Sequence, residues 1–350
     1  MSKAVLFDPV ESPYLVPFDG SFSIKKAPTK ADDDPGKAEN KEMLPEIVDE
    51  LNKLQGKLYA NDHYNVLLIF QALDAAGKDG TIRAVLTGVN PVGCQVFAYK
   101  APNAEELDHD FMWRMYKSLP ERGRIGVWNR SHYEEVLVVR VHPEFLDAQK
   151  LPRRPKNIEE LWEERFESIN AFEKHWARNG TIVLKFFLNV SQHEQHERFL
   201  ARVSDADNHW KFSNTDMEES RKWDDYQTAY QAALRATSKP WAPWYAIPAD
   251  SKPYMRRTVS QIIVDTLKQL DLPTPELSEK ARGQIAFVKA ELETELGVEA
   301  KPDDWTEKPT NHEDETNRDK DKDKEKEKKK EKKKEKKKKK KDKWKKDKDK

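Results

Sequence analysis

The sequence predicts an α/β fold in which helices cover both faces of a parallel sheet. Strand-like runs alternate with helical stretches through the middle of the chain, and this alternation is typical of parallel sheets. A glycine-flanked lysine turn follows the first of these strands, and a second polar segment follows the third. Because ligands of such sheets bind at the carboxyl ends of the strands, we expect both polar segments at one edge of the sheet.

The predicted strands are short runs between turn-forming residues. They cover residues 65–70, 94–99, 124–128, 181–188 and 244–247. The predicted helices cover residues 40–60, 81–88, 104–119, 131–141, 157–179, 191–203, 214–237 and 253–270. In the first helix, leucine and isoleucine recur every three or four positions, which indicates an amphipathic helix, and Pro45 is expected in its first turn.

Length and composition fit an intracellular enzyme. The chain has 350 residues, of which 37% are hydrophobic, enough for one large domain with additions. The single cysteine, Cys94, excludes an intramolecular disulfide framework and favours a cytoplasmic setting. No apolar run approaches the length of a membrane span, and the N-terminus lacks the basic-then-apolar order of a secretory signal. We therefore expect a cytoplasmic protein without a membrane partner.

Charge is distributed unevenly along the chain. Residues 321–350 contain 20 lysines and 9 acidic residues, a net charge of +11, so the first 320 residues carry −11. We expect an irregular N-terminal segment at 1–38, one domain at 39–300 with a lid at about 203–237, and a disordered lysine-rich tail at 301–350. The tail either holds a polyanion by counterion release or only keeps the protein soluble.

The segment from Ala72 to Thr81 predicts a phosphate-binding loop. It lies between a strand and a helix and matches the pattern G-x-x-x-x-G-K-[ST], except that Ala72 replaces the first glycine and Asp79 replaces the hydroxyl residue. In such a loop, backbone N–H groups and the helix N-terminus attract phosphate oxygens, and Lys78 adds a full positive charge. The expected phosphate-binding residues are Ala75, Ala76, Gly77, Lys78, Asp79, Gly80 and Thr81.

The altered loop also predicts where a metal ion binds. Because Thr81 lies two residues beyond the usual magnesium contact, we expect Mg²⁺ to bind Asp74, with Mn²⁺ as the alternative ion. The competing interpretation of the whole segment is an ordinary glycine-rich turn between a strand and a helix.

The second polar segment runs from Gly126 to Glu135 and predicts a site for charge neutralisation. Arg130 is suited to neutralise the charge of a transferring phosphoryl group. Asn129 stands where a metal-binding acid is expected, and its amide can bind Mg²⁺ through the carbonyl oxygen or position a bridging water. Because an amide brings no negative charge, Glu134 or Glu135 is expected to share the metal with Asp74. The alternative is that Asn129 or a neighbour only caps the next helix, with Glu134 favoured near its positive end.

The third segment predicts a basic helical lid. Asp216 follows Ser213 by three residues, which is typical of a helix start, and places Lys211 just before the helix and Arg221 about two turns along. Lys211, Asp216 and Arg221 are the candidate lid and nucleotide-binding residues. Such a lid excludes water, to which a phosphoryl group is otherwise lost. Three aromatic residues of the next helix share one face and are either core residues or a base-stacking surface: Trp223, Tyr226 and Tyr230.

Together these segments resemble the polyphosphate kinase 2 family. Features in the family's order run from about Leu44 to Leu270: D-A-A-G-K-D-G-T at 74–81, K-A-P at 100–102, H-D-F at 109–111 followed by Arg114, N-R-S-H-Y-E-E at 129–135, and W-K-F-S with W-D-D-Y in the lid. The resemblance implies a three-layer α/β/α, P-loop kinase-like core with a helical lid. It also implies reversible, Mg²⁺-dependent transfer of a phosphoryl group between inorganic polyphosphate and AMP or ADP.

The resemblance also assigns roles to residues of this chain. Asp74 holds metal and orients the acceptor phosphate, Lys78 contacts the transferring group, and four more cations line the phosphate surface: Arg83, Lys100, Arg114 and Arg130. Lys211 and Arg221 close from the lid. We expect adenine nucleotides as partners, with guanine nucleotides as the alternative, no specific nucleic acid, and a homo-oligomer that is a dimer or a tetramer.

Other functions remain open at this stage. The protein could accept ADP alone rather than both AMP and ADP, because a few pocket side chains decide such a preference. It could be a conventional nucleotide kinase with ATP as the donor. It could also be a non-catalytic polyanion-binding protein whose loop has lost its chemistry and whose tail does the binding.

Overall fold

The computed structural model describes residues 6–205, 214–273 and 275–298, and it separates the chain into two compact units. The first unit is Met1–Pro275 and contains the sheet. The second, Glu276–Lys350, contains one described helix, α11 (Glu279–Leu296). The expected domain boundary at 300 thus lies 25 residues beyond the division at Pro275. No residue of α11 is buried.

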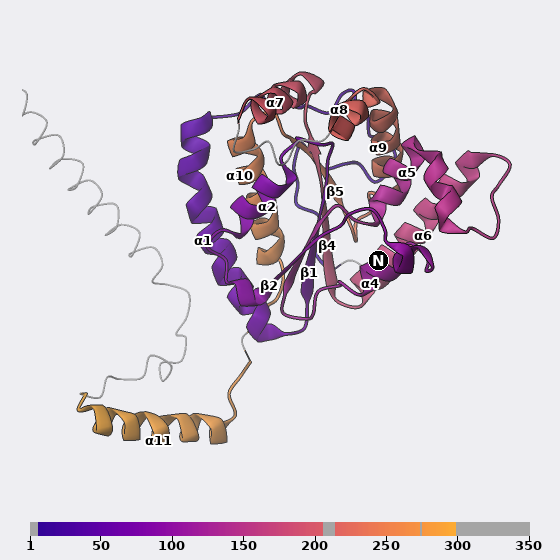
Figure 1. Cartoon of the computed structure of the whole chain (residues 1–350). Coiled ribbons are helices and arrows are strands. Elements are labelled where there is room, and N and C mark those ends of the chain that lie inside the picture. The colour runs from indigo at the N-terminus through magenta and orange to yellow at the C-terminus, as the bar shows by residue number, and fades with distance from the viewer. Residues whose placement is uncertain (1–5, 206–213, 274, 299–350) are drawn as a thin grey trace, which may run out of the picture. The chain divides into compact units, whose positions relative to one another are not determined.

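A five-stranded parallel sheet forms the centre of the first unit (Figure 1). Its strands lie in the order β2-β3-β1-β4-β5. They are β1 (Asn65–Gln71), β2 (Cys94–Ala98), β3 (Ile125–Asn129), β4 (Thr181–Asn189) and β5 (Trp244–Pro248). In the register of β1 and β3, Phe70 lies opposite Asn129, so both strands end at the same edge of the sheet. All five strands match the predicted ones to within a residue or two, which confirms the α/β fold class.

Helices cover both faces of the sheet. On one side lie α1 (Lys37–Asn61), α2 (Lys78–Leu86) and α10 (Lys252–Lys268), and on the other lie α4 (Trp113–Tyr116), α5 (Val138–Val141), α6 (Ile158–Arg178) and α9 (Trp223–Thr237) (Figure 1). The remaining helices of the unit are α3 (Ala104–Leu107), α7 (Gln192–Ser204) and α8 (Asn214–Ser220).

Side chains of β1 alternate between two hydrophobic clusters, as the pleat of a strand requires. Val66, Leu68 and Phe70 pack with α1, α2 and α10, whereas Leu67 and Ile69 pack with α6 and α9. Because both faces of the central strand are buried, its sequence is a continuous apolar run. The three layers of the predicted architecture are therefore present.

Several predicted helices differ from those observed. The prediction at 81–88 started too late, because α2 begins at Lys78, directly after the left-handed Gly77. The continuous helix predicted at 104–119 is wrong: Asn103 caps α3, and Asp110 accepts a hydrogen bond from the N–H of Met112 and so starts a new turn before α4. The helix predicted at 131–141 is instead a 3₁₀ turn over His132–Val136 followed by α5.

The lid helix predicted at 214–237 is also interrupted. It divides into α8 and α9 because Arg221 and Lys222 make i→i−3 backbone hydrogen bonds to Glu218 and Glu219, which tighten and end the first helix. The proline prediction for α1 was wrong as well, since that helix begins at Lys37 and Pro45 lies inside it. Pro45 is exposed, so the carbonyl that it leaves unpaired can bind water.

The N-terminal segment follows the surface of the unit and adds to its edge. Leu15 forms an antiparallel bridge with Tyr245 of β5, and the N–H of Val16 donates to the carbonyl of Trp244. Val16 is fully buried. In the described part of the chain no helix is long and apolar enough to cross a membrane.

Candidate active site

The predicted phosphate loop joins the end of β1 to the start of α2. Two of its residues adopt left-handed backbone conformations, Ala75 with φ 61° and Gly77 with φ 106°. Glycine adopts this conformation freely, but alanine does so at a cost of about 1 kcal/mol or more. Ala72, which replaces the first glycine of the pattern, does not need a positive φ. The loop therefore curves as a phosphate loop does, with local strain at Ala75.

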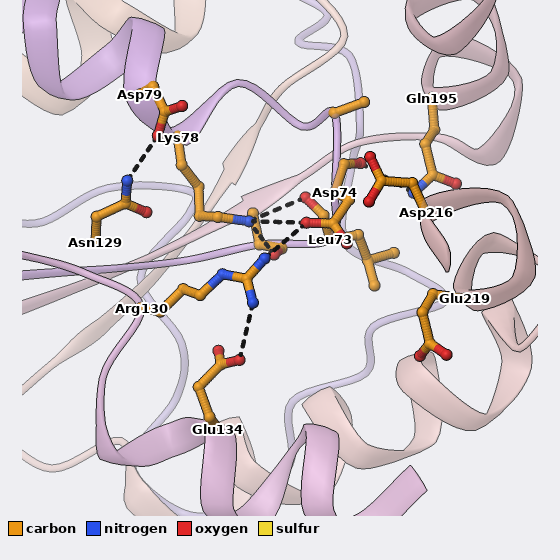
Figure 2. A network of polar contacts seen from close by, with 12 residues as sticks. Leu73, Asp74, Lys78, Asp79, Asn129, Arg130, Glu134, Gln195, Asp216 and Glu219 are labelled. Carbon is orange, nitrogen blue, oxygen red and sulfur yellow. Dashed lines mark hydrogen bonds and ion pairs between the residues drawn. The ribbon is translucent and has the colours of Figure 1, made fainter. Parts of the chain in front are cut away.

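Lys78 turns back into the concave side of this loop (Figure 2). Its ammonium donates hydrogen bonds to the carbonyls of Ala72 at 2.6 Å and Leu73 at 3.2 Å, and it lies 4.0 Å from Oδ1 of Asp74. Only 10% of the side chain is exposed. Burial lowers the pKa of Lys78, and Asp74 partly opposes that shift. The positive charge of Lys78 therefore lies on the inner side of the loop, next to Asp74.

Arg130 connects the end of β3 to the loop. Its guanidinium lies 3.0 Å from Oδ1 of Asp74 and 3.5 Å from Oε2 of Glu134 (Figure 2). The backbone of Arg130 is left-handed, with φ 64°, and this turn aims the side chain across the end of the sheet. Burial raises the pKa of Glu134, while Arg130 and Lys78 lower it in part. Two cations and two carboxylates thus meet at one edge of the sheet.

Asn129 lies beside this cluster but contacts a different partner. Its side-chain amide donates to Oδ1 of Asp79 at 2.6 Å, which links the end of β3 to the first turn of α2. Among the described residues no three His, Cys, Asp or Glu side chains lie close enough together to hold a metal ion. The oxygens of the proposed metal ligands Asp74, Asn129 and Glu134 therefore do not form one cluster. The guanidinium of Arg130 lies between the carboxylates of Asp74 and Glu134.

This arrangement still fits Mg²⁺, which commonly binds through one or two carboxylates plus substrate phosphates and keeps several waters. Asp74 is the best-placed protein ligand, because it lines the cleft described below and its side chain is 33% exposed. The remaining ligands would come from phosphate and water.

Arg198 of α7 supports the loop through hydrogen bonds, a role that sequence analysis missed. Its guanidinium donates to the carbonyls of Ala76 at 2.6 Å, Ala75 at 3.2 Å and Ala249 at 2.6 Å. Its Nε donates to Glu194 one turn earlier. Because Arg198 joins the strained part of the loop to α7 and to the segment that follows β5, it positions the loop. The only signal in the sequence was an arginine on the helix that follows a strand end.

A cleft of about 800 Å³ opens in front of the loop. Its lining includes many of the predicted phosphate-binding residues: Asp74, Ala75, Gly77, Lys78, Asp79, Gly80, Lys100 and Arg130. Further basic side chains that were not predicted also line it, namely Arg198, Arg202, Lys252 and Arg256. Positive charge exceeds negative charge in this lining, so the cleft is suited to a polyanion.

Some predicted residues lie elsewhere. Arg83 is exposed on α2 and is not part of the cleft lining. Arg114 is buried, donates to the carbonyl of Lys100 at 2.9 Å and pairs with Glu106, and it lines a neighbouring cavity of about 430 Å³. Ala76 and Thr81 are buried beneath the loop, where the hydroxyl of Thr81 donates to the carbonyl of Gly77.

Of the predicted lid residues, Asp216 lies at the site and Arg221 does not line it. Asp216 pairs with Arg202 at 2.8 Å, and both line the cleft. Arg221 is exposed in the turn after α8, and Lys211 lies outside the described residues. Of the aromatic residues on α9, Tyr226 and Tyr230 are buried and also line a small pocket with Arg130. Their burial agrees with the interpretation of that aromatic face as core, and the base-stacking interpretation stays a prediction.

Fold and site together define a P-loop kinase-like α/β protein, with a lysine loop after β1 and an arginine after β3. The sequence profile described as polyphosphate kinase 2 matches residues 34–275. The chain belongs to the polyphosphate kinase 2 family.

Individual relatives agree with this assignment. A protein of Rhodopseudomonas palustris named ADP-polyphosphate phosphotransferase is 49% identical over 270 residues, which cover 77% of this chain and 93% of that protein. A protein of Meiothermus ruber named AMP/ADP-polyphosphate phosphotransferase is 42% identical over 75% of this chain and 95% of its own length. The crystal structure of polyphosphate kinase 2 from Arthrobacter aurescens TC1 is similar with a TM-score of 0.71 and 35% identity, covering 83% of this chain and 97% of that one.

Proposed function

We propose that this protein moves a phosphoryl group reversibly between inorganic polyphosphate and adenine nucleotides, forming ADP from AMP and ATP from ADP. The observation that carries this proposal is the meeting of Lys78, Asp74 and Arg130 at the mouth of a cleft with a basic lining. The names of the relatives support the substrates: one names ADP, and the other names both AMP and ADP.

Phosphoryl transfer requires alignment and charge neutralisation more than a strong nucleophile. Lys78 and Arg130 supply two positive charges within reach of one loop, and each is paired with protein oxygens in the structure. A bound phosphate competes for these cations, because its oxygens are stronger acceptors than backbone carbonyls. Asp74 is then free to orient the acceptor phosphate, which is already anionic and needs no general base.

When bound, Mg²⁺ would neutralise charge on the phosphate oxygens. Asp74 is the carboxylate that we propose as its protein ligand, because it lines the cleft, whereas Glu134 does not line it and the amide of Asn129 donates to Asp79. Mn²⁺, whose ligand preferences are similar, is expected to substitute.

A direct assay tests the proposal. The full-length protein is mixed with Mg²⁺, polyphosphate and either AMP or ADP, and ATP is measured by luminescence. Formation of ATP with ADP as the acceptor, and no product with AMP, would indicate an enzyme that accepts only ADP. Transfer that requires ATP as donor, with none from polyphosphate, would identify a conventional nucleotide kinase instead. Binding of polyphosphate without any turnover would favour the non-catalytic alternative.

Three finer expectations accompany this proposal. Adenine nucleotides are the proposed acceptors, and a parallel assay with GDP measures the guanine alternative. A homo-oligomer is proposed, and light scattering on the purified chain measures its size. A cytoplasmic location is proposed, because the chain has a single cysteine, Cys94, and so cannot form an intramolecular disulfide. Burial raises the pKa of the Cys94 thiol to about 11, which makes it a poor nucleophile.

A further inference from the structure

A second charged cluster lies inside the protein, away from the cleft. It pairs Lys185 of β4 with Glu173 of α6, and both side chains are 0% exposed. The ammonium of Lys185 lies 2.5 Å from Oε2 of Glu173 and donates to the hydroxyl of Tyr133 at 2.9 Å and to the carbonyl of Thr237 at 2.8 Å. The hydroxyl of Tyr133 in turn donates to Oε1 of Glu173 at 2.8 Å.

These contacts join three separate parts of the molecule. Tyr133 belongs to the segment that begins at Arg130, and Thr237 is the last residue of α9. Lys185 therefore places a positive charge at the carboxyl end of α9, where the helix dipole favours it. The indole of Trp244 on β5 donates to the hydroxyl of Thr237 at 2.9 Å and completes the enclosure.

A buried ion pair of this kind is not explained by stability alone. Removing two charges from water is costly, and apolar replacements of similar volume are often as stable. Burial lowers the pKa of Lys185 to about 8, with Glu173 opposing the shift. Burial also pushes the pKa of Glu173 upward, but Lys185 and His132 outweigh it and the pKa ends below its ordinary value. What the pair does supply is a fixed geometry between the elements that it joins.

That geometry reaches the active site through Arg130. The N–H of Arg130 is bonded to the carbonyl of Phe70 at 3.0 Å, which fixes one end of the segment. The hydroxyl of Ser131, which follows, accepts from Gln71 at 3.1 Å. The other end of the segment is held through Tyr133 by the buried pair, and through Glu135, whose carbonyl accepts a hydrogen bond from Arg165 at 2.7 Å. Between these two anchors the backbone of Arg130 is held in its left-handed conformation.

The lid side of the site depends on the same pair. Tyr230 of α9 lines the small pocket that also contains Arg130 and Glu134. Because Lys185 donates to the carbonyl of Thr237, the last residue of α9, its buried ammonium contributes to the position of this helix relative to Arg130.

We propose that Lys185 and Glu173 are positioning residues for the transfer reaction, which hold Arg130 and the base of the lid in register. The proposal rests on the proposed function, because it concerns the rate of that reaction. Neither residue touches substrate. Their effect is transmitted by Tyr133 to Arg130 and by Thr237 to α9.

The test is a double-mutant cycle on the full-length chain. One arm is Lys185→Met with Glu173→Gln, which removes both charges together and leaves an amide oxygen to accept from Tyr133. The other arm is Arg130→Lys. We expect the first arm to lower kcat about tenfold with little change in KM for polyphosphate. We expect the combined variant to lose less than the product of the two separate losses, because both arms act in part through Arg130.

Two further variants separate positioning from simple loss of stability. Ile263→Ala removes a fully buried side chain of α10 on the other face of the sheet and is expected to lower Tm while leaving kcat of the folded protein unchanged. Tyr133→Phe removes only the hydroxyl that links the pair to the Arg130 segment, and is expected to lower kcat two- to fivefold with a small change in Tm.

The outcomes are distinguishable from failure of the proposed function. If the unmodified protein makes no ATP from polyphosphate, the function is wrong and the cycle is not needed to show it. If the unmodified protein is active and the effects of the two arms multiply, or if the charge-free variant keeps full kcat, the positioning role is overturned. Loss of rate in Ile263→Ala equal to that in Tyr133→Phe would overturn it as well.

Discussion

Two ion pairs hold the segment that begins at Arg130, and they differ in how exposed their side chains are. In the first, Arg130 and Asp74 are 38% and 33% exposed and lie 3.0 Å apart at the mouth of the cleft. In the second, Lys185 and Glu173 are 0% exposed and lie 2.5 Å apart between the sheet and α6. Water can reach and screen the first pair, whereas the second pair has no alternative partners outside the protein.

The difference separates two roles for charge in one domain. An accessible pair can open when a phosphate arrives, because each partner is solvated as it is released. A buried pair cannot open without leaving an uncompensated charge in the interior, which costs about 3–5 kcal/mol. The accessible pair is therefore suited to chemistry, and the buried pair is suited to holding the chemistry in place.

The largest expected effect is at Lys78, in the phosphate loop beside the accessible pair. Lys78→Ala is expected to lower kcat about 10³-fold, because it removes the positive charge on the inner side of the phosphate loop. ATP formation from ADP and polyphosphate measures this. Arg83→Ala is the matched control, since Arg83 is exposed on the same helix and does not line the cleft. An equal loss in both variants would show that general attraction of polyphosphate, and not the loop, limits the rate.

The next effect in size concerns Arg130. Arg130→Ala is expected to lower kcat about 10²-fold, and Arg130→Lys is expected to recover only part of that loss, because an ammonium cannot bind two oxygens in the forked geometry of a guanidinium. Steady-state rates at saturating polyphosphate measure both. Full activity of Arg130→Lys would mean that charge alone matters here, and the comparison between the two pairs would lose its basis.

A smaller effect is expected at Arg198, which combines both roles. Arg198→Met removes charged hydrogen bonds to the carbonyls of Ala75, Ala76 and Ala249, and should lower the free energy of unfolding by about 2 kcal/mol. Urea unfolding measures the loss, and kcat should fall about tenfold because the loop is no longer held. The control is Glu197→Ala on the same helix, an exposed partner of His193 whose loss should cost less than about 0.5 kcal/mol.

Sequence patterns predicted the sheet well because strands buried on both faces leave continuous apolar runs. They also located the loop at Lys78 and the segment at Arg130, since strand ends of a parallel sheet gather at one edge. The helix predicted at 104–119 was wrong because Asn103 and Asp110 each start a separate short turn through their side chains. Such local capping competes with periodicity and is hard to weigh from spacing alone.

Residues that act through tertiary contacts could not be predicted in this way. Arg198 and Lys185 look in the sequence like an ordinary surface arginine on a helix and an interruption in an apolar strand. Their roles depend on partners 12 to 123 positions away. Arg114 shows the opposite case, because its type suggested a phosphate contact but its guanidinium is held by the carbonyl of Lys100 and by Glu106.

The smallest expected effect concerns Asp216, where the lid meets the cleft. Burial raises the pKa of Asp216 above its ordinary 3.8, the charge of Asp74 raises it further, and Arg202 only partly opposes them. The folded protein therefore binds this proton more tightly than the unfolded chain does. As pH rises from 3.8 through the raised pKa, the folded state loses stability relative to a chain without this carboxyl.

Asp216→Asn removes that titration, so its Tm should decline less than that of the unmodified protein as the pH is raised from 3.8 to neutrality. The difference should be about 2 °C, because Asp216 is a single, partly exposed group in a large domain. Melting curves at a series of pH values with and without polyphosphate measure it. Since a bound polyanion adds negative charge next to Asp216, the difference should grow when polyphosphate is present. If Tm changed with pH in the same way in both proteins, Arg202 would compensate the carboxylate of Asp216 fully. The ion pair of Asp216 and Arg202 would then stay closed across this pH range, as the buried pair does.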